Sequence, residues 1–256
     1  MTDPLRLILR LEGNSPELDE AALHVARIEY PGLQIEPWLA ALDFHAQEIE
    51  RRRGRSARVA ISDYLFGELG IVGNEADYYN PRNSCLNHVL EARNGIPITM
   101  CVLYMELGRR LGVAVEGIGA PGHFLVRMEE EGDTFYVDPY NGGRIREDVE
   151  SELDEQYLVA APKRVILIRM LNNLRLIYLQ RQAWKKAGEV LDLLLEADPE
   201  DADALRQRGA TLAATQRFRA AAEDLNRYLQ LRPEDPDKEE LKNQIGRLRR
   251  MHAHKN

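Results

Sequence analysis

A histidine and an aspartate fifteen residues apart form the densest chemical signal in the sequence. His123 lies in the run PGHFLV, and Asp138 lies in YVDPYNGG. If residues 123–128 and 134–138 are adjacent strands of one sheet, the two side chains face each other across the ladder. A carboxylate in that position fixes the tautomer of the imidazole and stabilises its charged form. A base in nucleophilic catalysis requires this arrangement.

Cys101 is the candidate nucleophile for this pair. The segment Asn94-Gly95-Ile96-Pro97 predicts the start of a helix that carries Cys101, because proline suits the first turn of a helix. The competing interpretation is an inert buried thiol, since Cys101 is flanked by apolar residues and free cysteines are often buried. Cys85 is interpreted as a packing residue.

His123 and Asp138 also have structural interpretations. His123 can hold the PGH turn, and Asp138 can form a turn through a hydrogen bond from its own side chain to the following backbone. Asn141-Gly142-Gly143 is most simply a turn. Both interpretations of the His123 and Asp138 pair therefore stay open at the level of sequence.

The surrounding pattern changes from helix to strand. Helical periodicity is expected over 17–30, 36–54, 56–70 and 84–93. After residue 112 the runs VAVEGIGAP, GHFLVRMEE and TFYVD are short, rich in branched residues and separated by turn residues. These features predict several antiparallel strands.

The last third of the chain repeats itself with a period of 34 residues. The matched pairs are Leu171 with Leu205, Tyr178 with Leu212, Trp184 with Phe218, Ala187 with Ala221, Leu191 with Leu225, and Pro199 with Pro233. This is the tetratricopeptide pattern of helical hairpins, in which small residues allow close helix crossing and a proline ends each unit. The sequence predicts two such repeats, followed by a capping helix over about 238–251.

The middle of the chain resembles the core of the transglutaminase-like cysteine-protease superfamily. The segments GIPI, PGHFLVR and DPYNGG, with helices before them and tetratricopeptide repeats after them, resemble a bacterial transglutaminase-like family named after an invasion-regulator locus. A related core occurs in an F-box protein. The resemblance covers essentially the whole chain.

The resemblance implies a triad of cysteine, histidine and aspartate. Two of these three positions match residues of this chain directly, and the cysteine position does not. His123 and Asp138 occupy the histidine and aspartate positions. In active members the cysteine lies about 15 residues before a glycine, and Gly112 matches that glycine here. The expected position of the cysteine therefore falls near residues 97–99. Cys101 lies one helical turn further in, so its sulfur is displaced by about 5–6 Å.

Composition and charge exclude several classes of protein. The chain has 256 residues, a net charge of −8 and two cysteines, which do not suffice for a disulfide scaffold. Residues 1–160 carry a net charge of −13 and residues 161–256 a net charge of +5. We expect a cytoplasmic protein without a membrane segment, nucleic-acid partner, metal site or cofactor, because no corresponding motif is present.

We therefore predict an α+β fold: a transglutaminase-like core with N-terminal helices, followed by an all-α tetratricopeptide region. The expected parts are 1–80, the N-terminal helices; 81–160, the helix and antiparallel sheet; and 161–256, two repeats and a capping helix. The favoured function is a non-catalytic, regulatory adaptor that binds a protein or peptide through the repeats. The alternative is an active cysteine-type hydrolase or acyltransferase that uses Cys101, His123 and Asp138.

Overall fold

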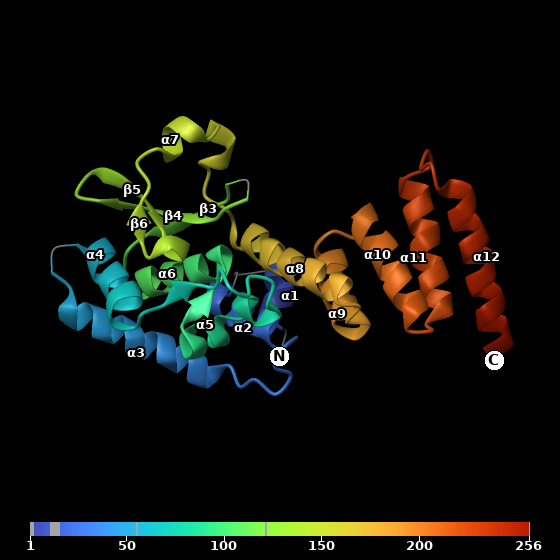
Figure 1. Cartoon of the computed structure of the whole chain (residues 1–256), viewed down its shortest axis with the longest axis horizontal. Coiled ribbons are helices and arrows are strands. Elements are labelled where there is room, and N and C mark those ends of the chain that lie inside the picture. Colours follow the sequence, from blue (N-terminus) through green and yellow to red (C-terminus); the bar gives the residue numbers. More distant parts are fainter. Residues whose placement is uncertain (1–2, 11–15, 55, 121, 256) are drawn as a thin grey trace. The chain divides into compact units, whose positions relative to one another are not determined.

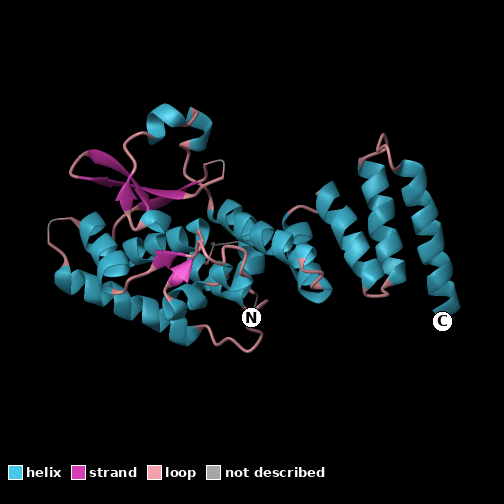
Figure 2. Ribbon diagram, in the orientation of Figure 1, coloured by secondary structure: helices cyan, strands magenta, loops and turns pink. Residues whose placement is uncertain are grey.

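The computed structural model describes residues 3–10, 16–54, 56–120 and 122–255 (Figure 1). The chain divides into two compact units, Met1–Met170 and Leu171–Asn256. The helix α8 contains the boundary, because it runs over Lys163–Gln180. The α+β class predicted from the sequence is confirmed by helices together with two small sheets in the first unit and by helices in the second (Figure 2).

The first unit begins with helices and places its strands after them. Its described helices include α1 Pro4–Arg10, α2 Leu18–Ala26, α3 Glu36–Arg52, α4 Ala57–Ser62, α5 Leu86–Ala92, α6 Pro97–Arg110 and α7 Val149–Glu152. Shorter helical turns are the π-helix Asp63–Glu68 and the 3-10 turns Pro81–Ser84, Pro139–Asn141 and Glu155–Tyr157. The helix predicted over 56–70 is therefore α4 followed by the π-helix.

Four strands form an antiparallel sheet in the order β3-β4-β5-β6. Their bounds are β3 Val115–Ile118, β4 Leu125–Glu130, β5 Asp133–Asp138 and β6 Arg144–Ile145. A separate parallel pair joins β1 Val72–Gly73 to β2 Asn94–Gly95. In the larger sheet Val126 pairs with Val137, so the start of β4 lies beside the end of β5. This register brings the two predicted site residues to one end of the sheet.

The helix α6 is the core element of the first unit. Its residues are buried on every side: Pro97, Ile98, Thr99, Met100, Cys101, Val102, Leu103, Tyr104, Glu106, Leu107 and Gly108. A helix that is apolar on all faces must be covered on all faces. A β carbon on Gly108 would collide with the side chain of Val115, so glycine lets β3 lie directly against α6.

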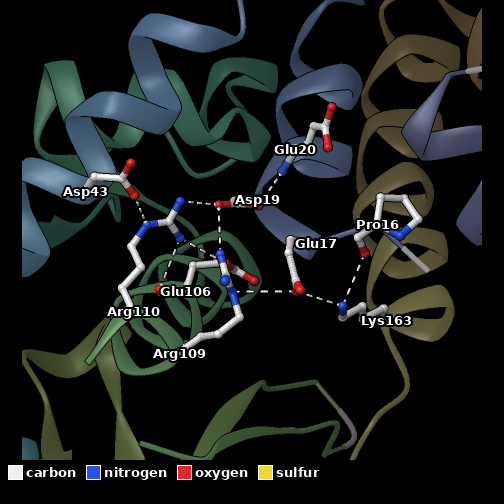
Figure 3. Close-up of polar contacts among 9 residues, drawn as sticks. All are labelled: Pro16, Glu17, Asp19, Glu20, Asp43, Glu106, Arg109, Arg110 and Lys163. Atoms are coloured by element: carbon white, nitrogen blue, oxygen red, sulfur yellow. Dashed lines mark hydrogen bonds and ion pairs between the residues drawn. The ribbon is translucent and has the colours of Figure 1, made fainter. Parts of the chain in front are cut away.

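Two buried carboxylates meet the arginines at the end of α6 (Figure 3). Arg110 lies 2.5 Å from Oδ2 of Asp19 and 3.1 Å from Oε2 of Glu106. Its Nε lies 2.7 Å from Oδ1 of Asp43 on α3. Burial and the neighbouring Asp19 raise the pKa of Glu106, although hydrogen bonding from Arg109 opposes the shift. These contacts tie α2 and α3 to the C-terminal end of α6.

The second unit consists of helical hairpins. After the second half of α8 come α9 Trp184–Ala197, α10 Ala202–Ala214, α11 Phe218–Leu231 and α12 Lys238–Lys255. The repeat residues predicted to pack are buried at Leu171, Leu205, Tyr178, Leu212, Ala187, Ala221, Leu191 and Leu225. The capping helix is longer than the predicted 238–251, and it buries Leu241, Ile245 and Leu248 against the repeats.

Gly209 and Gly188 give a matched test of packing in the repeats. A β carbon on Gly209 would lie 2.8 Å from Cγ of the buried Leu225, whereas one on Gly188 would lie 3.7 Å from its nearest neighbour. Overpacking typically costs 1–3 kcal/mol, and alanine gains about 1 kcal/mol over glycine within a helix. We expect Gly209→Ala to lower the free energy of unfolding by about 1 kcal/mol and Gly188→Ala to raise it by about 0.5–1 kcal/mol.

Urea unfolding followed by the fluorescence of Trp184, in a Trp38→Phe background, measures both changes in the second unit. Equal stabilisation by the two alanines would show that α10 and α11 do not approach each other closely at Gly209.

Candidate functional site

The structure brings His123 and Asp138 together. Nε2 of the His123 ring lies 2.8 Å from Oδ2 of Asp138. The Asp138 side chain is 1% exposed, whereas that of His123 is 26% exposed. His123 lies in the turn before β4, which begins at Leu125, and not within the strand as the sequence predicted. Gly122 has a φ of +71°, so extended pairing begins only after this turn.

Asp138 is held by more than the histidine. The side-chain amide of Asn141 donates to Oδ2 of Asp138 at 2.7 Å, and the backbone N–H of Asn141 donates to Oδ1 at 3.2 Å. Burial alone would raise the pKa of Asp138, but the hydrogen bonds from His123 and Asn141 outweigh it and lower the pKa. An ionised Asp138 accepts a hydrogen bond from Nε2–H of His123, so Nδ1 is the ring nitrogen that takes no part in this bond.

Arg169 on α8 fixes the turn that presents His123. Its guanidinium donates to the backbone carbonyls of Ala120 at 3.2 Å and His123 at 3.3 Å. The same group lies 5.3 Å from the centre of the Phe124 ring, within the range of a cation–π contact. Because Arg169 bonds to the backbone on both sides of this turn, it fixes the backbone that carries the His123 ring.

Cys101 lies close to this site, and its thiol bonds to the backbone of the residue that follows His123. The Cys101 thiol donates to the backbone carbonyl of Phe124 at 3.2 Å, and the residue is fully buried. Burial, with a smaller contribution from Asp138, raises the pKa of the Cys101 thiol well above its usual range. A thiol in this state is a poor nucleophile, because the thiolate is the reactive form.

The start of α6 explains this placement. The helix begins at Pro97, as predicted, and Ile96 precedes it with extended backbone. Cys101 is therefore one turn inside the helix, where side chains face the packed core. Thr99 is also buried, and its hydroxyl makes no hydrogen bond within the described part of the chain. Neither Pro97 nor Thr99 supplies a thiol at the helix start.

Two residues of the site were not singled out from the sequence. Asn141 was interpreted only as part of a turn, although its spacing of three from Asp138 is typical of side-chain-capped turns. Arg169 lies 46 residues from His123 and gave no local signal. Among the described residues, no group of three or more His, Cys, Asp or Glu side chains is placed to hold a metal ion. No described helix is long and apolar enough to cross a membrane.

Comparison with known families agrees with this architecture. The profile described as "Transglutaminase-like superfamily" matches residues 36–172, and the one described as "Tetratricopeptide repeat" matches residues 174–246. Both resemblances predicted from the sequence are thereby confirmed.

Individual relatives are bacterial and eukaryotic. A UPF0162 protein of Xylella fastidiosa is 38% identical over 238 residues, which cover 84% of each chain. A UPF0162 protein of Vibrio cholerae is 29% identical over 91% of this chain and 92% of its own. The F-box only protein 21 of Homo sapiens is 34% identical over 57% of this chain and 26% of its own. Among solved structures, menin has a TM-score of 0.45 at 10% identity over 95% of this chain and 74% of its own, too distant to bear on function.

Asp138→Asn tests whether the buried carboxylate is ionised, through the pH dependence of the free energy of unfolding. Because folding lowers the pKa of Asp138, its ionised form stabilises the fold above the unfolded-state pKa of about 3.9, and this contribution disappears as the pH falls below that value. We expect Asp138→Asn to lower the free energy of unfolding by about 1–3 kcal/mol at pH 7, with the difference shrinking below about pH 4.

Urea unfolding at a series of pH values, followed by Trp38 fluorescence in a Trp184→Phe background, reports on the first unit. Asp133→Asn is the matched control, because Asp133 is exposed at the other end of β5. A difference between wild type and Asp138→Asn that stays constant from pH 7 to pH 3 would contradict the ionised, hydrogen-bonded state of Asp138.

Proposed function

We propose that this chain, which belongs to the transglutaminase-like superfamily, acts as a non-catalytic, regulatory adaptor with a degenerate cysteine, histidine and aspartate site. The single observation that carries this proposal is the complete burial of the Cys101 thiol. It is fully buried and donates to a backbone carbonyl, while His123 bonds to Asp138. The constellation keeps the histidine and its carboxylate, while burial raises the pKa of the neighbouring Cys101 thiol and so disfavours the thiolate.

The repeats supply the binding function in this proposal. Tetratricopeptide repeats generally mediate contacts between proteins, and solenoid repeats present extended surfaces for partners. Leu176 on α8 and Ala210 on α10 are equivalent positions of the two repeats, because they lie 34 residues apart, and both are exposed. Leu176 is a large apolar side chain that is 60% exposed. We propose that a protein or peptide partner covers this position.

The preserved pair of His123 and Asp138 favours a second candidate function. In an active cysteine-type hydrolase or acyltransferase, His123 would take the proton of the Cys101 thiol and Asp138 would stabilise the resulting imidazolium. This function requires the buried Cys101 thiol to give up its hydrogen bond to Phe124 and lose its proton to the His123 ring. A third function lies between these two. In it, the cleft of an ancestral enzyme still binds an extended peptide but catalyses no reaction.

The cytoplasm is the compartment that fits this proposal. Cys85 and Cys101 are both buried thiols, as expected for a chain that folds where thiols stay reduced.

Leu176→Asp tests the adaptor function directly. A charge at a partner-covered position would be desolvated on binding, so we expect recovery of the partner to fall about tenfold, which corresponds to 1.4 kcal/mol. Stability should change by less than about 0.5 kcal/mol, because the position is exposed. The measurement is quantitative mass spectrometry of proteins that co-purify with the full chain from the organism that encodes it.

Met251→Asp is the matched control, because Met251 is an equally large apolar residue that is 51% exposed on α12. Specific partners retained by Met251→Asp and lost by Leu176→Asp would support the proposal. An identical set of co-purifying proteins for wild type and Leu176→Asp would contradict it.

A further inference from the structure

The sheet of the first unit has an open edge at β3. In the order β3-β4-β5-β6, β3 pairs with β4 on one side only. On its other side Ile118 forms an isolated antiparallel bridge with Ala160, and Ala161 N–H donates to Gly117 C=O at 2.8 Å. Pairing stops there, because Pro162 has no N–H and the chain enters α8 at Lys163.

The backbone of Val115 points to this open edge. In an antiparallel ladder the N–H and C=O of one residue point to the same side, and those of residues two apart point alike. Since Gly117 faces outward to Ala161, the N–H and C=O of Val115 also face outward. No strand of the described chain pairs with Val115 on this side. An unpaired strand edge is a template for another strand.

A pocket of about 380 Å³ lies along this edge. Its apolar wall includes Leu18, Met105, Val113 and Val115, and Arg109 and Lys163 line it as well. The pocket therefore combines backbone groups that can pair, an apolar surface and two cations. Glu106 also lines it and is already bonded to Arg109 and Arg110.

The carboxylate of Glu17 binds to both Arg109 and Lys163. Its Oε2 lies 2.9 Å from Nζ of Lys163 and 3.6 Å from Nε of Arg109 (Figure 3). All three side chains are between one third and one half exposed. Exposed ion pairs are weak, so this carboxylate can be exchanged for another of the same charge. The chain's own Glu17 thus occupies the position of a ligand carboxylate.

We propose that the β3 edge binds an extended segment of a partner protein, which pairs with Val115 and places a carboxylate between Arg109 and Lys163 in exchange for Glu17. An apolar residue of the same segment would pack on Leu18 and Met105. Charge complementarity selects an acidic segment, since a basic one would meet both cations. The residues of this surface all belong to the first unit and do not include His123, so the proposal goes beyond the adaptor function proposed above.

The proposal predicts opposite effects for two substitutions. Glu17→Ala removes the competing carboxylate and should tighten binding about two- to fivefold, as expected for loss of one exposed ion pair. Lys163→Glu removes a cation and adds repulsion, so it should weaken binding about tenfold or more. Lys163→Glu is expected to fold, because glutamate is favourable at a helix start. Arg146→Glu, which makes the same change of charge directly after the far strand β6, should leave affinity unchanged.

The probe is a phage-displayed library of random decapeptides panned against the full-length Glu17→Ala protein. We expect enriched peptides to contain Asp or Glu beside β-branched residues, and the synthetic peptides to follow the order of affinities above in fluorescence anisotropy. Hydrogen exchange at the Val115 amide should slow when peptide is bound. Absence of enriched acidic peptides, equal affinity for all variants, or unchanged exchange at Val115 would each overturn the proposal. None of these outcomes depends on partner binding by the repeats.

Discussion

The buried carboxylate of Asp138 is the constraint on which the site depends. Removing a carboxylate from water is unfavourable unless it is hydrogen-bonded and paired. Asp138 meets this requirement with three donors, the ring of His123 and the side chain and backbone of Asn141. The same bonds join the turn before β4 to the end of β5. The residue that orients His123 therefore also closes one end of the sheet.

The helix α6 imposes the second constraint, and it works against chemistry at Cys101. A helix buried on all sides has few positions where a side chain can reach a cleft, and these lie at its first turn. Pro97 occupies that turn, and Cys101 follows one turn later among packed residues. Burial of the thiol therefore opposes its ionisation, and its hydrogen bond to the Phe124 carbonyl holds it in the packed interior.

Much of the fold was predictable because its signals are local. The 34-residue period, the helix start at Pro97 and the alternation of strand and turn residues each depend on neighbours in sequence. The pairing of His123 with Asp138 was also predictable, since a short hairpin limits which residues face each other. What could not be predicted depends on distant contacts with no pattern of their own.

Arg169 and the β3 edge show this limit. Arg169 donates to backbone carbonyls, which every residue possesses, so nothing near His123 marks its partner. The open edge exists because Pro162 diverts the chain into α8 beside β3, and its position became apparent only from the sheet order. The direction of the Cys101 thiol likewise depends on Phe124, 23 residues away.

The central claim is that His123 and Asp138 lack a reactive cysteine, and an assay of acyl transfer tests it most directly. Purified full-length wild type, Cys101→Ala and His123→Ala are incubated with a glutamine-containing peptide and a fluorescent primary amine, and both amine incorporation and amide hydrolysis are measured. Because the thiol is buried and bonded to a carbonyl, we predict that wild type shows no turnover above either variant. Turnover by wild type that is lost in Cys101→Ala would contradict the non-catalytic function and establish the chain as a cysteine-type acyl enzyme.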